Sequence, residues 1–324
     1  MQAPTPPLIS IALCTFNGER HLREQLDSLL AQDWPHIEIV AIDDASTDAT
    51  PAILEGYTKQ DARIRYSRNG RNLGYHRNFE AAITRCQGRW IAPCDQDDIW
   101  LPHKLSTLAS ELSSGGALLA YGDSALVNEQ GQPLNQRLSD RMNRFSTDDP
   151  VAYWFANNVT GHAMLFERSL LEHALPFPTH LFHDWWLAYV AASTGRISYV
   201  DQCLVHYRQH AQTVTDITGS RPNPAERKRG FRWRELADTR ARLERFAEVP
   251  GKGQAMTREL LGLWRARETQ FVSCRLAYFL WKHRQRIDAI SKDSASKKAR
   301  RPFQYIWGLR TKQLLEPHRY VHTS

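Results

Sequence analysis

Apolar runs and helical repeats alternate over the first 122 residues of the chain. Short apolar runs predict strands at Leu8–Cys14, Ile37–Ile42, Ile64–Tyr66, Trp90–Cys94 and Ala117–Tyr121. Helical spacing and helix-start signals predict helices over 22–30, 50–60 and 78–85 and after Pro102. This order is typical of an α/β fold with a mostly parallel sheet and helices on both faces.

Polar loops follow three of these predicted strands, at Thr15–Gly18, Asp43–Asp48 and Asp95–Asp98. Ligands of such sheets bind beyond the carboxyl ends of the strands, so we expect one site that these loops share. The chain contains no GxGxxG motif after the first strand and no GxxxxGK[ST] motif, so neither common phosphate-binding loop is predicted.

The pattern loosens after residue 122 and becomes regular again at Thr160–Phe166. A helix from about His183 to Ser193 and strands at Ile197–Val200 and Leu204–Tyr207 are predicted next. Beyond a Pro- and Arg-rich segment at 219–230, the remaining sequence has helical spacing. We therefore divide the chain into a domain of residues 1–216, with halves of about 1–122 and 123–216, and an extension of residues 217–324.

The net charge of +7 conceals two regions of opposite sign. Residues 1–216 hold 17 Lys and Arg against 25 Asp and Glu, whereas residues 217–324 hold 25 against 10. Such a basic extension implies an anionic neighbour, either lipid headgroups, nucleic acid or a phosphorylated acceptor, or else a solvated helical face. Five cysteines without metal-type spacing, no signal sequence and no run of about 20 apolar residues predict a cytoplasmic protein.

The loop Asp95–Asp98 is the strongest chemical signal in the sequence. Its three carboxylates follow a predicted buried strand, where mutual repulsion and desolvation are costly. A hard divalent cation with oxygen ligands, holding a diphosphate, would offset that cost. The alternative is an acidic turn that caps the next helix.

Other polar residues allow both a functional and a structural interpretation. Asp43 or Asp44 can accept hydrogen bonds from a base or a ribose, or can cap a turn. Asp184 can serve as a general base or as a helix cap. The remaining candidates are Trp185 and Trp186 for a sugar site or core packing, Arg208 for phosphate, and His210 for a metal or a structural hydrogen bond.

In this order, these elements resemble a family 2 glycosyltransferase with the GT-A fold, from about Leu8 to Thr215. The resemblance is carried by Ser10–Gly18, Ile42–Asp48, Asn69–Gly74, Asp95–Trp100, His183–Asp184 and Tyr207–His210. It implies a nucleotide site at Thr15, Phe16, Asn17, Asp44 and Asp95, with Asp43 close by. It also implies a DxD pair at Asp95 and Asp97, with Asp97 or Asp98 as a ligand of Mg²⁺ or Mn²⁺ on the donor diphosphate. Asp184 would be the catalytic base, and His210 would lie near the metal or diphosphate. Members of the family usually carry Glu-Asp where this chain has His183 and Asp184.

The resemblance also suggests substrates. The segment Cys94–Trp100 resembles bacterial enzymes that decorate surface polysaccharides, many of which use dTDP-L-rhamnose; a UDP-hexose is the alternative donor. The acceptor would be a glycan or a lipid-linked glycan, and the basic extension, with Trp264, Trp281 and Trp307, would suit the inner face of the membrane. The rival classes are a nucleotidyltransferase, a nucleic-acid-binding protein and an inactive scaffold. Acidic strand-end loops argue against nucleic acid, and the presence of Asp95, Asp97 and Asp184 argues against inactivity.

Overall fold

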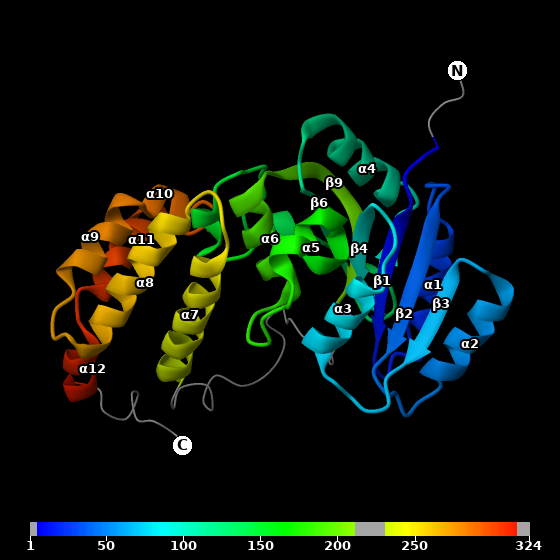
Figure 1. Cartoon of the computed structure of the whole chain (residues 1–324), viewed down its shortest axis with the longest axis horizontal. Coiled ribbons are helices and arrows are strands. Elements are labelled where there is room, and N and C mark those ends of the chain that lie inside the picture. The colour runs from blue at the N-terminus through cyan, green and yellow to red at the C-terminus, as the bar shows by residue number, and fades with distance from the viewer. Residues whose placement is uncertain (1–4, 211–230, 316–324) are drawn as a thin grey trace.

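The computed structural model of the chain describes residues 5–210 and 231–315 (Figure 1). Over these residues a nine-stranded sheet is covered by helices, and a helical C-terminal region lies at the opposite end of the molecule from strand β3. The strands of the first half are β1 (Ile9–Thr15), β2 (Ile37–Asp43), β3 (Ile64–Arg68) and β4 (Trp90–Cys94). The helices that follow them are α1 (Leu22–Leu30), α2 (Thr50–Gln60), α3 (Tyr75–Thr84) and α4 (Lys104–Gly115).

The first four strands form the predicted parallel arrangement, in the order β3-β2-β1-β4. Every residue of β1, β2 and β4 is buried, as expected for strands whose two faces are both covered by helices. The register pairs Thr15 with Asp43, and Leu13 with Cys94. The three polar loops therefore leave the sheet side by side at one edge, as predicted.

The second half turns this parallel core into a mixed sheet. Its strands are β5 (Ile99–Trp100), β6 (Leu119–Val127), β7 (Pro133–Arg137), β8 (Met164–Glu167) and β9 (Ile197–Arg208). The order continues β4-β8-β6-β9-β5, with β8 antiparallel to β4 and β6, and β9 parallel to β6. The mostly parallel prediction thus holds for the first half. The two strands predicted at 197–200 and 204–207 are one strand, and β5 was not predicted.

Short helices and turns connect these strands. The helices are α5 (Leu171–Ala174) and α6 (His183–Thr194), and the 3₁₀ segments are η1 (Leu138–Asp140), η2 (Pro150–Tyr153), η3 (Gly161–Ala163) and η4 (Arg168–Leu170). Helix α6 is buried on nearly all sides, so it lies inside the molecule.

The C-terminal region is helical, as predicted. It consists of α7 (Phe231–Glu248), α8 (Gln254–Thr269), α9 (Cys274–Lys282), α10 (Arg284–Ile287), α11 (Ala295–Arg300), the 3₁₀ segment η6 (Arg301–Tyr305) and α12 (Leu309–Leu315). The proposed boundary at residue 216 and the segment 219–230 lie outside the described residues. None of the helices described is both long and apolar enough to cross a bilayer.

The C-terminal helices share a hydrophobic core with strands of both halves of the sheet. Phe246 of α7 stacks on Tyr189 of α6, with ring centroids 3.6 Å apart. The Thr257 hydroxyl of α8 accepts a hydrogen bond from Trp154 Nε1 at 2.9 Å and lies 2.9 Å from the Tyr189 hydroxyl. Helices α7 and α8 therefore pack directly against α6 and form part of the same core.

Candidate active site

Asp43 organises the loop at the end of β2. Its buried carboxylate accepts hydrogen bonds from the Thr15 hydroxyl at 3.1 Å and from the backbone N–H of Ser46 at 2.9 Å, and it also pairs with Arg68 at 3.3 Å. The Ser46 hydroxyl donates a further short bond to it. With its oxygens engaged in this way, Asp43 fixes the ends of β1 and β2 relative to one another.

Asp44 holds a second segment, residues 69–74, beside the same edge. Its oxygens accept hydrogen bonds from Asn69 Nδ2 at 2.8 Å and from the backbone N–H groups of Leu73 at 2.8 Å and Gly74 at 2.9 Å. Gly74 has φ of 82°, a conformation that side chains rarely adopt, so glycine is needed at the turn that brings this N–H to the carboxylate.

A cavity of about 560 Å³ lies between these loops. The predicted nucleotide residues that line it are Thr15, Phe16, Asn17, Asp44 and Asp95. Gln96 closes it on one side, because the backbone N–H of Phe16 donates to Gln96 Oε1 at 2.8 Å while Gln96 Nε2 donates to the Phe16 carbonyl at 3.0 Å. The Phe16 ring is exposed and available to a planar ligand. We call this space the donor cavity.

A second cavity, of about 330 Å³, adjoins the first. Tyr75, Asp95 and Asp97 line both cavities. The other side of the second cavity is formed by residues of the later half of the domain, among them Leu138, Met142, His162, Asp184 and Trp185. We call it the acceptor cavity.

Asp184 is the second residue of α6 and faces the acceptor cavity. Burial raises the pKa of its carboxyl to about 6, against the opposing effect of the backbone N–H groups around it, among which that of Trp185 donates at 2.6 Å. A carboxylate with a pKa just below neutrality is ionised at pH 7 and still basic enough to accept a proton. The position suits the predicted general base.

Asp95 and Asp97 lie where the two cavities meet. Burial, followed by the nearby charges of Asp97 and Asp184, raises the pKa of Asp95 to about 8. Asp97 Oδ2 lies 2.8 Å from Nε2 of His210, the last described residue of this segment. The structure therefore brings the predicted metal candidates Asp97 and His210 into direct contact at the donor cavity.

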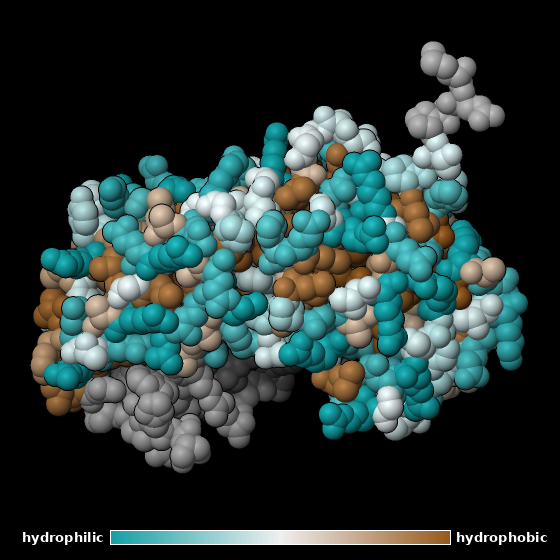
Figure 2. Space-filling view, in the orientation of Figure 1, coloured by the Kyte–Doolittle hydropathy of each residue, from teal (hydrophilic) through white to brown (hydrophobic). Residues whose placement is uncertain are grey.

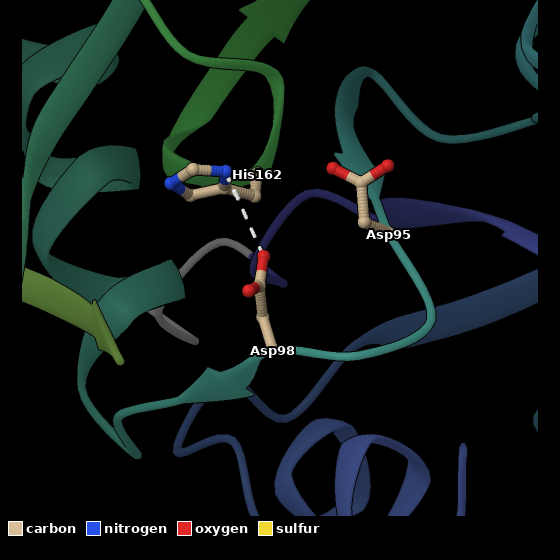
Figure 3. Close-up of side chains that lie close together, drawn as sticks. All are labelled: Asp95, Asp98 and His162. Atoms are coloured by element: carbon tan, nitrogen blue, oxygen red, sulfur yellow. Dashed lines mark ion pairs between the residues drawn. The ribbon is translucent and has the colours of Figure 1, made fainter. Parts of the chain in front are cut away.

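Asp98 is buried, and its carboxylate points toward His162 (Figure 3). Its Oδ1 accepts a hydrogen bond from the backbone N–H of Arg208 at 3.1 Å, and its Oδ2 lies 3.6 Å from Nδ1 of His162. Asp95, Asp98 and His162 offer ligand atoms that all lie within 4.8 Å of one another. Within the described residues Oδ2 has no hydrogen-bond partner, and burial together with Asp97 and Asp95 raises the pKa of Asp98 well above its ordinary value.

His162 is a site residue that the sequence did not reveal. It is buried, its Nε2 lies 2.9 Å from the Ser124 hydroxyl, and its ring stacks on Tyr207 at 4.3 Å between centroids. Burial lowers the pKa of His162 well below its ordinary value, so the ring is neutral. A single histidine far from Asp98 along the chain carries no spacing signal that would have identified it.

Arg208, a predicted diphosphate contact, is almost wholly buried in protein interactions. It donates to the Asp97 carbonyl at 2.8 Å, to the Glu129 carbonyl at 2.8 Å and to Glu24 Oε2 at 2.5 Å. Its side chain thus ties the loop of Asp97 and Asp98 to α1 and to the β6–β7 turn.

The two tryptophans after Asp184 have different surroundings. Trp185 lines the acceptor cavity, and its Nε1 donates to the Tyr153 carbonyl at 2.7 Å. Trp186 is buried in the core, where its Nε1 donates to the Ala174 carbonyl at 2.7 Å. Packing therefore removes Trp186 from the predicted sugar contacts and leaves Trp185 as the candidate.

Comparison with solved structures identifies the fold. The fold is similar to that of Staphylococcus aureus TarS 1–349, solved in complex with UDP-GlcNAc, with a TM-score of 0.58 and 17% identity over 97% of this chain and 93% of that one. It is also similar to the mannosyltransferase PcManGT from Pyrobaculum calidifontis, solved in complex with GDP-Man and Mn²⁺, with a TM-score of 0.51 and 18% identity over 97% and 81%. The architecture is therefore the GT-A fold of glycosyltransferases.

Sequence relatives narrow this class to a family. Residues 10–175, just over half of the chain, match the family described as Glycosyl transferase family 2, and the chain belongs to it, as predicted. The putative glycosyltransferase EpsH of Bacillus subtilis is 29% identical over 64% of this chain and 62% of its own length. The putative teichuronic acid biosynthesis glycosyltransferase TuaG of the same organism is 32% identical over 40% and 52%. The protein is a glycosyltransferase.

Proposed function

We propose that the protein is an inverting, metal-dependent glycosyltransferase that moves a sugar from a nucleotide diphosphate donor to a hydroxyl of a cell-surface glycan. The observation that carries this proposal is the position of Asp184. Its carboxylate, with a pKa near 6, faces a cavity that shares Tyr75, Asp95 and Asp97 with the larger donor cavity. A base on one side and a nucleotide-sized space on the other is the arrangement that a single displacement needs.

In this proposal the donor cavity holds the nucleotide. The residues that would contact the base and ribose are Thr15, Phe16, Asn17 and Asp44, because they line this cavity. The buried Asp43 would hold their loops in place. Asp95, at the junction of the cavities, would lie beside the ribose or the diphosphate.

Asp97, Asp98 and His210 would hold Mg²⁺ or Mn²⁺ on the diphosphate. Two observations fit a cation: the raised pKa values of Asp95 and Asp98, and an Asp98 oxygen without a hydrogen-bond partner among the described residues. A cation would remove the repulsion between these carboxylates, and when bound it supplies positive charge that stabilises the leaving diphosphate. Arg208 would contribute by holding this loop, because its donors already bond to protein groups.

The reaction is a one-step exchange of bonds. Asp184 takes the proton of an acceptor hydroxyl while that oxygen attacks the anomeric carbon and the bond from that carbon to the diphosphate breaks. The transition state has oxocarbenium character, and one displacement inverts the configuration at the anomeric carbon. Trp185, on the wall of the same cavity, would pack against the acceptor sugar.

The resemblance and the names of relatives support a choice of donor and acceptor. TuaG is named for teichuronic acid biosynthesis and ExoO of Rhizobium meliloti for succinoglycan biosynthesis, which supports a surface glycan such as lipopolysaccharide core or O-antigen as acceptor. The resemblance of Cys94–Trp100 supports dTDP-L-rhamnose as donor. The TarS complex with UDP-GlcNAc supports the alternative, a UDP-hexose. Acceptors of this kind place the enzyme in the cytoplasm at the inner face of the membrane.

A thermal-shift screen of dTDP, UDP and GDP, each with and without Mn²⁺, tests the proposal. A ligand that binds only the folded state raises its apparent stability, so we expect one nucleotide to raise Tm when Mn²⁺ is present. Asp97→Asn should abolish the metal-dependent part of the shift. Release of a nucleoside diphosphate, as opposed to pyrophosphate, then separates a glycosyltransferase from a nucleotidyltransferase. The absence of any shift with all three nucleotides and Mn²⁺ would count against the donor site.

A further inference from the structure

Exposed apolar side chains gather at the end of the molecule formed by α9, η6 and α12. Of 11 exposed large hydrophobic residues in the described chain, seven lie in this region. We call them the aromatic tip: Phe271, Val272, Tyr278, Trp281, Phe303, Trp307 and Leu314. Figure 2 shows brown side chains at this end of the molecule. Trp264, which the sequence grouped with Trp281 and Trp307, is buried at 3% exposure and does not belong to the tip.

The residues of the aromatic tip are held in an ordered framework. Val272 forms a β-bridge with Trp307, and the Phe271 carbonyl accepts hydrogen bonds from the Gly308 N–H and the Thr311 hydroxyl, both at 2.8 Å. Helix α9 buries its inner face and turns Tyr278 and Trp281 outward, with their rings stacked 6.1 Å apart. The exposed rings therefore project from a folded support.

The same region is strongly basic. Residues 271–315 contain 11 Lys and Arg against two Asp, and both aspartates are paired inside the region. Asp288 pairs with Arg301, and Asp293 pairs with Lys297 at 2.6 Å.

Two arginines lie directly over exposed rings of the tip. The Arg284 guanidinium is 4.6 Å from the centroid of Trp281, and that of Arg310 is 5.7 Å from the centroid of Phe271. The tip thus presents apolar rings surrounded by positive charge.

We infer that the aromatic tip is the surface through which the protein docks on an anionic phospholipid bilayer. Tryptophan and tyrosine rings favour the headgroup level of a membrane, and each neighbouring Lys or Arg gains about 1 kcal/mol from an anionic leaflet. A second copy of the chain carries the same positive charge at its tip and would be repelled. Nucleic acid would satisfy the charge but would offer Val272 and Leu314 no apolar phase.

The C-terminal region that carries the aromatic tip also contacts the segment beside the acceptor cavity. The Ile290 carbonyl accepts a hydrogen bond from the backbone N–H of Asn143 at 2.9 Å, and the Asn143 side chain donates to the Ala289 carbonyl at 2.9 Å. Met142, the preceding residue, lines the acceptor cavity. Only this link to a membrane-borne acceptor rests on the proposed function; the docking surface itself does not.

Vesicle co-flotation of the full chain tests the inference, without nucleotide, metal or acceptor. One set of vesicles is phosphatidylcholine alone and the other contains roughly one third phosphatidylglycerol, a content that gives an anionic surface. We expect binding to the mixed vesicles that weakens with added salt. Trp281→Ser should weaken it about tenfold, because an interfacial ring is lost. Lys282→Glu should weaken it about fivefold or more, because one favourable charge is replaced by an unfavourable one.

Lys59→Glu, a matched charge reversal at an exposed position of α2, should leave vesicle binding unchanged. Equal losses for Lys59→Glu and Lys282→Glu, or no binding by the unmodified chain, would overturn the inference. So would tighter binding to a short DNA duplex than to mixed vesicles, or a dimer in sedimentation that Trp281→Ser disperses. Because no sugar donor is present, these results are independent of the nucleotide screen, and each proposal can fail without the other.

Discussion

The hydroxyl oxygen of Tyr75 lies 2.9 Å from Nδ1 of His183, the residue immediately before the proposed catalytic base. Burial lowers the pKa of His183 to about 3 and raises that of Tyr75 well above its ordinary value, so this is a hydrogen bond between neutral groups. The imidazole also stacks on Phe79, with ring centroids 4.1 Å apart. These contacts fasten the start of α6, and with it Asp184, to α3.

Tyr75→Phe should therefore misplace Asp184 as well as destabilise the fold. Removing the hydroxyl leaves Nδ1 of His183 buried without a partner, which costs about 1–3 kcal/mol in the free energy of unfolding. We expect kcat to fall several-fold at saturating donor, and chemical denaturation and steady-state kinetics would measure the two effects. Tyr66→Phe, on β3 and away from both cavities, is the control. Unchanged kcat in Tyr75→Phe would show that the bond does not position the base.

The pH dependence of the reaction should report the ionisation of Asp184. A general base acts only when ionised, so kcat/KM should rise with pH, with an inflection near the Asp184 pKa of about 6, and then level off. Asp184→Asn should reduce kcat about a thousandfold, within the range for loss of a general base. A profile that is flat from about pH 5 to 8 would assign the base to another group.

Asp184 should also lower the stability of the fold at neutral pH. Its folded pKa of about 6 exceeds its ordinary value of 3.8, so the fold binds this proton more tightly than the unfolded chain does. The stability that protonated Asp184 gives the fold is therefore fully present below about pH 4 and is lost as pH rises through about 6. Asp184→Asn should be more stable than the unmodified protein at about pH 8, by at most roughly 3 kcal/mol. Denaturation of both proteins in EDTA at about pH 4 and about pH 8 checks this prediction. Equal stability of the two proteins at about pH 8 would contradict it.

Mn²⁺ binding should distinguish His210 from His162. His210 contacts Asp97 at the donor cavity, whereas His162 is bonded to Ser124 and stacked on Tyr207. We expect His210→Ala to weaken Mn²⁺ binding at least about tenfold in calorimetric titration, and His162→Ala to lower stability with a smaller effect on the ion. The opposite ranking would place the ion among Asp95, Asp98 and His162.

A residue of the C-terminal helices should affect acceptor binding. The Arg242 guanidinium of α7 lies 4.4 Å from the ring centroid of Trp185, on the wall of the acceptor cavity, and its Nε donates to the Trp154 carbonyl at 3.2 Å. A cation–π contact of this kind contributes about 1 kcal/mol, so Arg242→Ala should raise the acceptor KM about fivefold and leave the donor KM unchanged. Arg240→Ala is the matched control, because Arg240 is an exposed residue of the same helix that pairs with Glu268 of α8. Equal effects on both KM values would contradict the assignment.

The sequence predicted those parts of the fold that local patterns determine. Strands buried on both faces appear as continuous apolar runs, which located β1, β2 and β4. Asp95 and Asp184 stood out because carboxylates beside apolar segments need a physical reason. Strand β9 was divided because Asp201 and Gln202, in its middle, are exposed and interrupt the apolar pattern.

Contacts between distant segments could not be predicted. Nothing in the local sequence indicates that His162 lies beside Asp98. Nor does it show that the Arg208 guanidinium donates hydrogen bonds to Glu24 and to backbone carbonyls. Trp264 is buried and Trp307 is exposed, although both lie in similarly basic sequence. Tertiary packing decides the difference, because Trp264 lies on the buried side of α8 whereas Trp307 forms a β-bridge with Val272.

The two cavities are built from different lengths of the chain. Apart from Tyr75, Asp95 and Asp97, the donor cavity is lined by residues 14–96 and His210, and the acceptor cavity by residues 138–207. Under the proposed function, mutation can therefore change the acceptor while the nucleotide is recognised as before, and the reverse also holds. Duplicated genes with this architecture could then diversify a glycan one linkage at a time, because within residues 5–210 and 231–315 only three side chains line both cavities.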